Sequence, residues 1–427
     1  MDKLLIKGAK VIDPANGLDD ILDLLIIDGR IAKLAPNLKV EDAEIIQAVG
    51  LVCAPGLVDM HVHLRDPGQT QKEDIESGCC AAAAGGVTSI ACMPNTTPVC
   101  DKPEIIKDIL TRSKSAPARL YPVAAVTKSL GGTELTNFQE LKKSFAVAVS
   151  DDGRPVLTAG LMMEAMQKAA EIGLRVLSHC EELSLVRGGV MNSGEVSELL
   201  GVPGITRAAE DVGTARDIVI AASTGLPVHI CHISTRGSVA MLREARKRGI
   251  PVTGETAPHY FMLSEELLKK RDADYRMNPP LRTQDDIEAV IEGLCDGTIS
   301  AIATDHAPHT AEEKADFLHA PNGVIGLETS LAAGITALVN PGYLELTRLI
   351  SLMSLQPAQI LGISAGTLTV GCPADVVIFD PDEQWIVKPD ELHGKSRNTP
   401  FKDMTLTGRV KTTLLGGRAV YQNNKIN

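Results

Sequence analysis

Four histidines and two aspartates in this chain have residue types and spacings suited to metal chemistry. His61 and His63 are separated by one residue, so their side chains share a face if they lie on a β-strand. Neutral imidazoles and carboxylates are ligands of borderline cations such as Zn²⁺. Six such groups exceed the needs of one tetrahedral site, and a carboxylate can bridge two ions. The predicted two-metal site comprises His61, His63, Asp152, His179, His232 and Asp305.

Taken singly, each of these residues has an ordinary structural interpretation. A lone histidine at a strand end is more often a hydrogen-bonded core residue than a ligand. The sequence Asp151-Asp152-Gly153 is typical of a turn, and Asp305 suits a helix cap or a loop anchor. The combination favours metal binding, because four of the ten histidines and two aspartates fall at the ends of predicted strands.

The elements that must position these residues are short apolar runs, suited to strands buried on both faces, that alternate with helix-compatible stretches. Such alternation, repeated eight times, predicts an α/β fold of the (β/α)8 TIM-barrel type, which places catalytic groups at the carboxyl ends of its strands. A doubly wound sheet would instead show a glycine-rich loop after its first strand. The runs end near Asp59-His61, Met93, Val126, Ser150, His179, His232, Glu255 and Asp305, and helices are predicted over 74–84, 102–114, 137–143, 159–172, 207–223, 236–248 and 284–295.

Both ends of the chain are predicted to form short strands joined by tight turns such as Asp28-Gly29. Neither end is large enough to close a core alone, so we expect them to pair into one small β-sandwich domain. The predicted domains are this composite of 1–52 and 358–427 and a catalytic barrel over 53–357. Strands expected in the second part include 367–370 and 376–379.

Composition excludes several classes of protein. The 427 residues carry 42 Lys and Arg against 54 Asp and Glu, a net charge of −12, with one Trp, five Tyr and six Phe. That balance disfavours nucleic-acid binding. No apolar run reaches the roughly 18 residues of a membrane span, and the first residues do not resemble a signal peptide. Nine cysteines scattered through apolar segments suggest reduced thiols in a cytoplasmic protein.

The remaining histidines receive different expectations. His229 lies three residues before His232, so on a strand it should face the other way and pack in the core. His259 is expected either beside the metal ligands or in a structural role. His306 is expected to orient the adjacent Asp305, and His309 to contact substrate from a loop over the barrel mouth.

The order of these motifs resembles that of the amidohydrolase superfamily, and the segment Gly366–Asp380 resembles that superfamily's return to its small β-domain. Within the superfamily, the chain is similar to bacterial-type dihydroorotases over nearly its whole length. The motifs that carry this similarity are His61-Val-His-Leu-Arg-Asp-Pro-Gly68, Met93-Pro-Asn-Thr96, Ser150-Asp-Asp-Gly153, Asn278-Pro-Pro-Leu-Arg282 and Asp305-His-Ala-Pro-His309.

The resemblance implies reversible cyclisation of N-carbamoyl-L-aspartate to (S)-dihydroorotate plus water, the third step of de novo pyrimidine (UMP) biosynthesis. It implies two Zn²⁺ ions per subunit bridged by Asp152 and a hydroxide, with Asp305 as the catalytic proton shuttle. By the same analogy, the first ion is held by His61 and His63 and touched by Asp305, and the second is held by His179 and His232.

The resemblance also implies a set of substrate-binding residues. Arg65 could hold the substrate carboxylate bidentately, and an ion pair with Asp66 or Asp74 is the alternative. Residues 310–321 are either a closing lid or a solvated loop. The implied substrate contacts are His63, Arg65, Asn95, Asn278, His309, Asn322 and Gly323.

One departure separates this chain from related cyclic amidases. Hydantoinases hold their metals with a carboxylated lysine at the fourth strand, and here the segment 145–150 contains no lysine. Asp152 is therefore the expected bridge. Two alternatives remain: an allantoinase or another cyclic amidase, and a non-catalytic dihydroorotase-like scaffold of aspartate transcarbamoylase, which would have lost metal ligands. Expected partners are a small-molecule substrate, a second copy in a homodimer and aspartate transcarbamoylase, with neither nucleic acid nor membrane.

Overall fold

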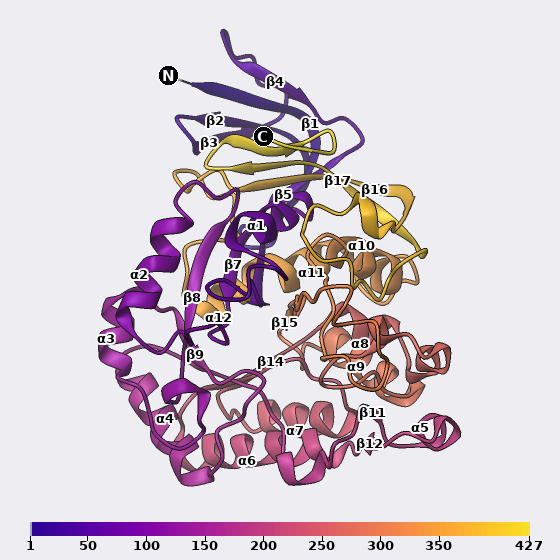
Figure 1. Ribbon diagram of the computed structural model, residues 1–427. Helices are drawn as coiled ribbons and strands as arrows, with labels where there is room; N and C mark the ends of the chain where they lie inside the picture. Colours follow the sequence, from indigo (N-terminus) through magenta and orange to yellow (C-terminus); the bar gives the residue numbers. More distant parts are fainter. Residues whose placement is uncertain (1) are drawn as a thin grey trace.

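The computed structural model describes residues 2–427 and contains an eight-stranded parallel sheet that forms a barrel (Figure 1). The barrel closes between the first strand and the chain that follows the last one, where Val62 bridges His306 and the His63 amide donates to the His306 carbonyl oxygen at 2.8 Å. The predicted barrel is thereby confirmed. Its strands are β6 (Leu57–Val62), β7 (Val87–Cys92), β8 (Arg119–Ala125), β9 (Ala148–Ser150), β10 (Val176–Ser178), β13 (Val228–Ile230), β14 (Val252–Thr256) and β15 (Ala301–Ile302).

Helices surround the barrel strands, and the seven predicted ones are all present (Figure 1). Local chemistry explains their limits: the Thr235 hydroxyl accepts from the Ser238 amide at the start of α7, whose Val239 and Leu242 are buried. The seven helices are α1 (Ile75–Ala84), α2 (Pro103–Arg112), α3 (Phe138–Lys143), α4 (Ala159–Glu171), α6 (Ala208–Thr224), α7 (Arg236–Lys247) and α9 (Gln284–Cys295).

Strands from the two ends of the chain form one mixed nine-stranded sheet, at the top of Figure 1. Its buried core joins both ends, with Ile6 and Leu24 packed in one cluster with Ile378 and Leu414. The strands are β1 (Lys3–Asp13), β2 (Leu18–Ile27), β3 (Arg30–Ala35), β4 (Glu44–Gln47), β5 (Val52–Pro55), β16 (Val376–Ile386), β17 (Thr405–Leu415), β18 (Arg418–Gln422) and β19 (Lys425–Ile426).

The strand expected over 367–370 is wrong. In the described chain this segment is irregular, because a side chain replaces a strand partner: Asp13 Oδ2 accepts from the Leu368 amide at 2.8 Å. Gly366 and Gly371 flank the segment with φ of +77° and +91°, which break an extended run.

Shorter elements complete the chain, and no helix within residues 2–427 is both long and apolar enough to cross a membrane. The remaining helices and strands are α5 (Glu195–Leu200), α8 (Pro258–Met262), α10 (Ser330–Gly334), α11 (Leu346–Ile350), α12 (Gln356–Leu361), β11 (Met191–Asn192) and β12 (Gly204–Ile205). Single 3₁₀ or π turns are η1 (Lys128–Leu130), η2 (Leu183–Leu185), η3 (Glu265–Lys270), η4 (Ala273–Tyr275), η5 (Ile335–Val339), η6 (Ser351–Leu355) and η7 (Pro389–Glu391).

Candidate active site

Asp152 lies among the four predicted histidines at the carboxyl ends of β6, β9, β10 and β13. Its Oδ1 is 3.2 Å from His61 Nε2, 3.5 Å from His179 Nδ1 and 3.4 Å from His232 Nε2. Its Oδ2 is 3.3 Å from His63 Nε2. All five side chains are buried. Residues far apart in sequence thus converge on one carboxylate, as their strand-end positions predict.

Asp305 reaches the same cluster from the end of β15. Its Oδ1 lies 3.1 Å from His63 Nε2 and 3.5 Å from His61 Nε2. The backbone of Asp305 is left-handed (φ +48°), as is that of His232 (φ +35°). This region is unfavourable for residues other than glycine, and such strain is typical of functional sites.

The buried atoms that face one another in this cluster suit a cation. Although His61 Nε2 and Asp152 Oδ1 lie 3.2 Å apart, neither has a hydrogen-bond partner among residues 2–427. Burial opposes charge on both groups. Even so, Asp152 and Asp305 raise the pKa of His61 well above its ordinary value, and the histidines hold the pKa of Asp152 well below its own. The buried carboxylates therefore require positive charge, which protons or divalent cations can supply.

Two overlapping groups of ligand atoms have the compactness that metal binding needs. Those of His61, Asp152 and His232 lie within 4.8 Å of one another, and so do those of His61, His63 and Asp305. Imidazole nitrogens and carboxylate oxygens are the donor set that zinc takes in catalytic sites. The residues present therefore fit the metal centre that the sequence predicts.

Glu255 is a residue of this site that sequence reasoning missed. On β14, its Oε1 lies 2.8 Å from His61 Nδ1 and its Oε2 lies 3.2 Å from His229 Nε2. Burial alone would raise its pKa, but the two histidines lower the pKa of Glu255 to about 2, so the carboxylate is ionised. The signal in the sequence was an acidic residue inside a strand that the barrel buries on both faces.

Glu181 is a second residue that sequence reasoning missed. It lies two positions beyond His179, and its Oε2 is 3.4 Å from His179 Nε2. Asn278 Nδ2 donates to Glu181 Oε1 at 3.0 Å, which brings a predicted substrate residue beside the cluster. Burial opposes the charge of Glu181, yet the contact with His179 holds its pKa below the ordinary value.

Asn95 contacts a histidine of the cluster in this structure. Its Oδ1 lies 2.8 Å from His63 Nδ1, which fixes the orientation of that ring. Since the amide oxygen is engaged, contact with a substrate would use the amide nitrogen.

Arg65 and His309 lie together beside the cluster. Arg65 Nε donates to the Pro308 carbonyl oxygen at 3.2 Å, and Nη2 lies 3.3 Å from His309 Nε2. His309 Nε2 is also 3.0 Å from the backbone oxygen of Asn322. A Cβ on Gly323 would come within 3.0 Å of His309 Nε2, and the φ of +138° there also favours glycine.

Neither alternative ion pair for Arg65 forms, so that interpretation is wrong. Asp66 pairs with Arg112 at 2.6 Å, and Asp74 pairs with Lys395. Burial lowers the pKa of Arg65 to about 10, opposed by Asp305 and Asp152, so the guanidinium stays charged at neutral pH. Within residues 2–427, Arg65 is a buried cation without an ion-pair partner.

The expectation that His306 orients Asp305 is wrong. His306 Nε2 lies 3.6 Å from Glu73 Oε2, and His306 Nδ1 accepts from the Gly326 amide at 3.3 Å. The left-handed backbone of Asp305 (φ +48°) turns the chain between the two residues, so their side chains point to different partners.

Two further histidines are buried near the cluster. His229 is buried as expected, but it bonds Glu255 rather than packing only against apolar groups. His259 Nε2 is buried and has no hydrogen-bond partner among residues 2–427. Burial lowers the pKa of His259 to about 4, so the ring is neutral.

The segment 310–321, expected as a lid or a solvated loop, packs against the chain that precedes Asn278. Lys314 Nζ donates to the Arg276 carbonyl oxygen at 3.2 Å and to the Pro321 carbonyl oxygen at 3.0 Å. Arg276 Nη1 in turn donates to the Phe317 carbonyl oxygen at 2.6 Å. Lys314 and Phe317 are buried, so this segment is not simply solvated.

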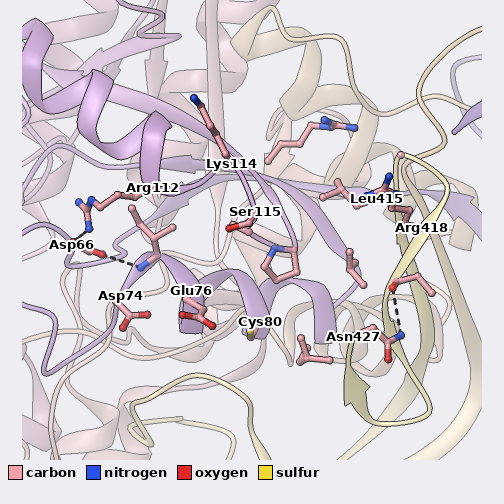
Figure 2. Close-up of a pocket in the computed structure, with 18 of the residues that line it drawn as sticks. Asp66, Asp74, Glu76, Cys80, Arg112, Lys114, Ser115, Leu415, Arg418 and Asn427 are labelled. Atoms are coloured by element: carbon pink, nitrogen blue, oxygen red, sulfur yellow. Dashed lines mark hydrogen bonds and ion pairs between the residues drawn. The ribbon is translucent and has the colours of Figure 1, made fainter.

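A second region with many charged side chains is an open groove of about 1150 Å³ between α1, the end of α2 and the C-terminal hairpin (Figure 2). Asp66 and Arg112 form an ion pair on one wall. Arg119 Nε donates to Asp375 Oδ2 at 2.9 Å nearby, and the exposed Arg418 lies at the opposite side. The clustered histidines do not line this groove.

Comparison with known proteins agrees with this geometry. A family model described as Dihydro-orotase-like matches residues 50–238. The dihydroorotase of Geotalea daltonii is 49% identical over 424 residues, which cover 99% of this chain and 100% of that protein. The dihydroorotase of Acetivibrio thermocellus is 47% identical, with 98% of each chain covered.

Solved structures of similar fold are cyclic amidases. An L-hydantoinase (dihydropyrimidinase) from Arthrobacter aurescens superposes with a TM-score of 0.90 at 24% identity, covering 100% of this chain and 98% of that one. A dihydropyrimidinase from Brevibacillus agri gives a TM-score of 0.85 at 24% identity, covering 99% and 96%. These likenesses establish the shared barrel, and the sequence relatives establish the branch. The chain belongs to the dihydroorotase family.

Proposed function

We propose that this chain is a dihydroorotase that interconverts N-carbamoyl-L-aspartate and (S)-dihydroorotate plus water, the third step of de novo pyrimidine biosynthesis. The observation that carries the substrate assignment is Arg65, a buried guanidinium without an ion-pair partner in residues 2–427, beside Asp305 and His309. A buried cation is costly unless an anion joins it. Dihydroorotate carries a carboxylate, whereas allantoin and dihydrouracil do not.

The cluster around Asp152 is proposed to hold two Zn²⁺ ions. His61, His63 and Asp305 would bind the first ion. His179 and His232 would bind the second ion, and Asp152 would bind both. When bound, the ions would polarise the amide carbonyl and lower the pKa of a water to about 7. The histidines would then bind metal in place of the protons that the buried carboxylates favour on them.

Asp305 is proposed to move the proton in both directions. In hydrolysis, its carboxylate accepts a proton from the attacking water while the new C–O bond forms. It then delivers that proton to the ring nitrogen as the C–N bond breaks. In cyclisation, the same carboxyl returns the proton to the departing water. The contact between Asp305 Oδ1 and His63 Nε2 at 3.1 Å holds this carboxylate at the cluster.

Arg65, His309, Asn95 and Asn278 are proposed to orient the substrate. The planar guanidinium of Arg65 matches a carboxylate with two parallel N–H donors. The absence of a side chain at Gly323 leaves room for His309, which a Cβ would contact at 3.0 Å. Asn322 contributes its backbone oxygen to His309, so its contact with substrate is the least supported by the geometry.

The test is loss of dihydroorotate absorbance, with allantoin and dihydrouracil as parallel substrates and metal content measured on the same sample. Chelator-sensitive hydrolysis of dihydroorotate alone is the expected result. Turnover of another cyclic amide by the metal-loaded protein would overturn the substrate assignment. Inactivity without metal, even after zinc is added, would favour the scaffold alternative.

The proposal extends to assembly and location. We propose a homodimer in the cytoplasm, with aspartate transcarbamoylase as a candidate protein partner. Sedimentation of the purified chain, alone and with that enzyme, measures both associations.

A further inference from the structure

A row of polar side chains runs through the interior of the barrel toward His61. Barrel interiors are normally filled by layers of branched apolar side chains, and an unpartnered buried polar group is costly. Here His229 and Glu255 are almost fully buried, 0% and 1% exposed. A polar row in this place therefore needs a complete set of partners, and the contacts supply one.

The Glu255 carboxylate, which can only accept, sets the direction of the hydrogen bonds in this row. His229 Nε2 donates to Glu255 Oε2 at 3.2 Å, so in the neutral ring Nδ1 accepts from the Thr253 hydroxyl at 2.8 Å. Arg175 Nη1 can only donate, and it lies 3.0 Å from Thr253 Oγ1.

The other end of the row is His61. Glu255 Oε1 lies 2.8 Å from His61 Nδ1, and an ionised carboxylate can only accept, so Nδ1 carries the hydrogen. In the neutral ring this leaves a lone pair on Nε2, the atom that faces Asp152 at 3.2 Å. The row thus selects the tautomer in which His61 can act as a ligand.

We propose that Glu255, supported by His229 and Thr253, is a positioning residue that holds His61 in its metal-binding tautomer and orientation. The inference rests on the proposed metal centre but not on the identity of the substrate. Strand pairing fixes the geometry, because His229 on β13 lies opposite Thr253 on β14 and Glu255 is two residues further on the same face.

A competing interpretation makes Glu255 a ligand itself. Ligand atoms of His61, Cys231 and Glu255 also lie within 4.8 Å of one another. The 2.8 Å contact between Glu255 and His61 Nδ1 favours a hydrogen bond, since a cation bound there would have to take the place of that proton. Zinc stoichiometry distinguishes the two interpretations.

The test compares zinc affinity in Glu255→Leu and Glu255→Gln by competition with a chromophoric chelator. Loss of the carboxylate in E255L should weaken binding by about 10–100-fold, the usual effect of removing the partner of a ligand histidine. E255Q keeps an oxygen toward His61 Nδ1 and should recover much of that affinity. Excess zinc should restore kcat in E255L with little change in KM.

Glu265→Leu is the matched control, because Glu265 is also buried and its Oε2 accepts from Asn192 at 2.7 Å. Zinc affinity in E265L should equal that of the parent. Parent-like affinity in folded E255L would overturn the proposal, as would a third zinc in the parent that E255Q and E255L lack. If E255L does not fold, E255Q and Thr253→Val carry the test, each expected to weaken zinc binding several-fold. Parent affinity in both would overturn it.

These measurements separate this inference from the proposed function. Zinc competition needs no substrate, so weak binding in E255L supports the role of Glu255 even if the parent does not hydrolyse dihydroorotate. Parent hydrolysis of dihydroorotate together with unchanged zinc affinity in E255L would leave the function intact and remove the positioning role.

Discussion

The histidine cluster and the groove of Figure 2 both contain many charged or ionisable side chains, but these side chains have different kinds of partners in the two regions. In and beside the groove, each buried carboxylate has an exposed arginine as its partner, as Asp66 has Arg112 and Asp375 has Arg119. In such a pair the carboxylate already has its cation, so the pair leaves no buried charge without a partner. In the cluster, buried histidines from three strand ends converge on Asp152. Convergence of buried lone pairs, rather than the volume of a cavity, therefore marks the site.

The largest expected effect comes from Asp305→Ala, which removes the proposed proton carrier from the cluster. We expect the fold and much of the bound zinc to remain, while kcat falls about 10²–10⁴-fold, the range for loss of a general acid–base group. The measurement is steady-state hydrolysis of dihydroorotate with zinc content determined in parallel.

Activity of D305A within a few-fold of the parent would contradict the proton-carrier role. Asp66 is the comparison from the groove, a buried carboxylate already paired with Arg112. Its replacement by Asn should alter stability more than the chemical step.

Arg65→Ala should act on substrate binding. Losing charged hydrogen bonds of about 1.5–3 kcal/mol should raise KM roughly 10–100-fold, with a smaller change in kcat. Arg65→Lys keeps the charge but loses the planar pair of donors, so its KM should lie between those of the parent and R65A. An unchanged KM would mean that another residue reads the carboxylate.

How much of this site could be predicted depends on whether sequence spacing alone fixes the geometry. The i, i+2 spacing placed His61 and His63 together, because alternation along a strand is regular. The expectation for His306 failed, because the chain leaves β15 with Asp305 in a left-handed conformation that no local pattern announces. Thus regular strands transmit side-chain direction reliably, and strained strand ends do not.

Local sequence patterns also could not predict which residues contact the histidines of the cluster. Glu255 meets His61 across 194 positions of sequence, and Glu181 is only two residues from His179. Neither forms a motif alone, since Glu255 in its strand could face either the barrel or a helix and Glu181 lies in the irregular chain after β10. The barrel could be predicted from the repeated alternation of strand-like and helix-like segments. The irregular conformation of 367–370 could not, because a buried aspartate replaced strand pairing there.

Lys314 and Lys114 differ in burial, and this difference predicts that, of the two, only Lys314 makes the free energy of unfolding depend on pH. Burial lowers the pKa of Lys314 to about 7, below its ordinary 10.5, whereas Lys114 lines the groove and is exposed. Between these two pKa values the unfolded chain binds more protons at Lys314, so its contribution to the free energy of unfolding rises with pH from 7 to 10.5.

Lys314→Met should therefore lose that rise. It should also lose about 1–2 kcal/mol at high pH from two hydrogen bonds to backbone carbonyls. Urea unfolding of the parent and variant at pH 7 and pH 9.5 measures the difference, which should be larger at the higher pH. Lys114→Met is the control and should show no such change. A parent–variant difference independent of pH would mean that Lys314 is not buried as a titrating amine.

The smallest expected effect is that of Arg418→Ala in the groove. Arg418 is exposed, and surface substitutions of this kind usually change stability by less than about 0.5 kcal/mol. The clustered histidines do not line the groove. Therefore kcat and KM for dihydroorotate should stay within about twofold of the parent, a change that corresponds to less than about 0.5 kcal/mol. Steady-state hydrolysis of dihydroorotate, as for Asp305→Ala and Arg65→Ala, measures both constants. A tenfold change in either would break the comparison, since it would show that an exposed charge in the groove acts on the reaction at a distance.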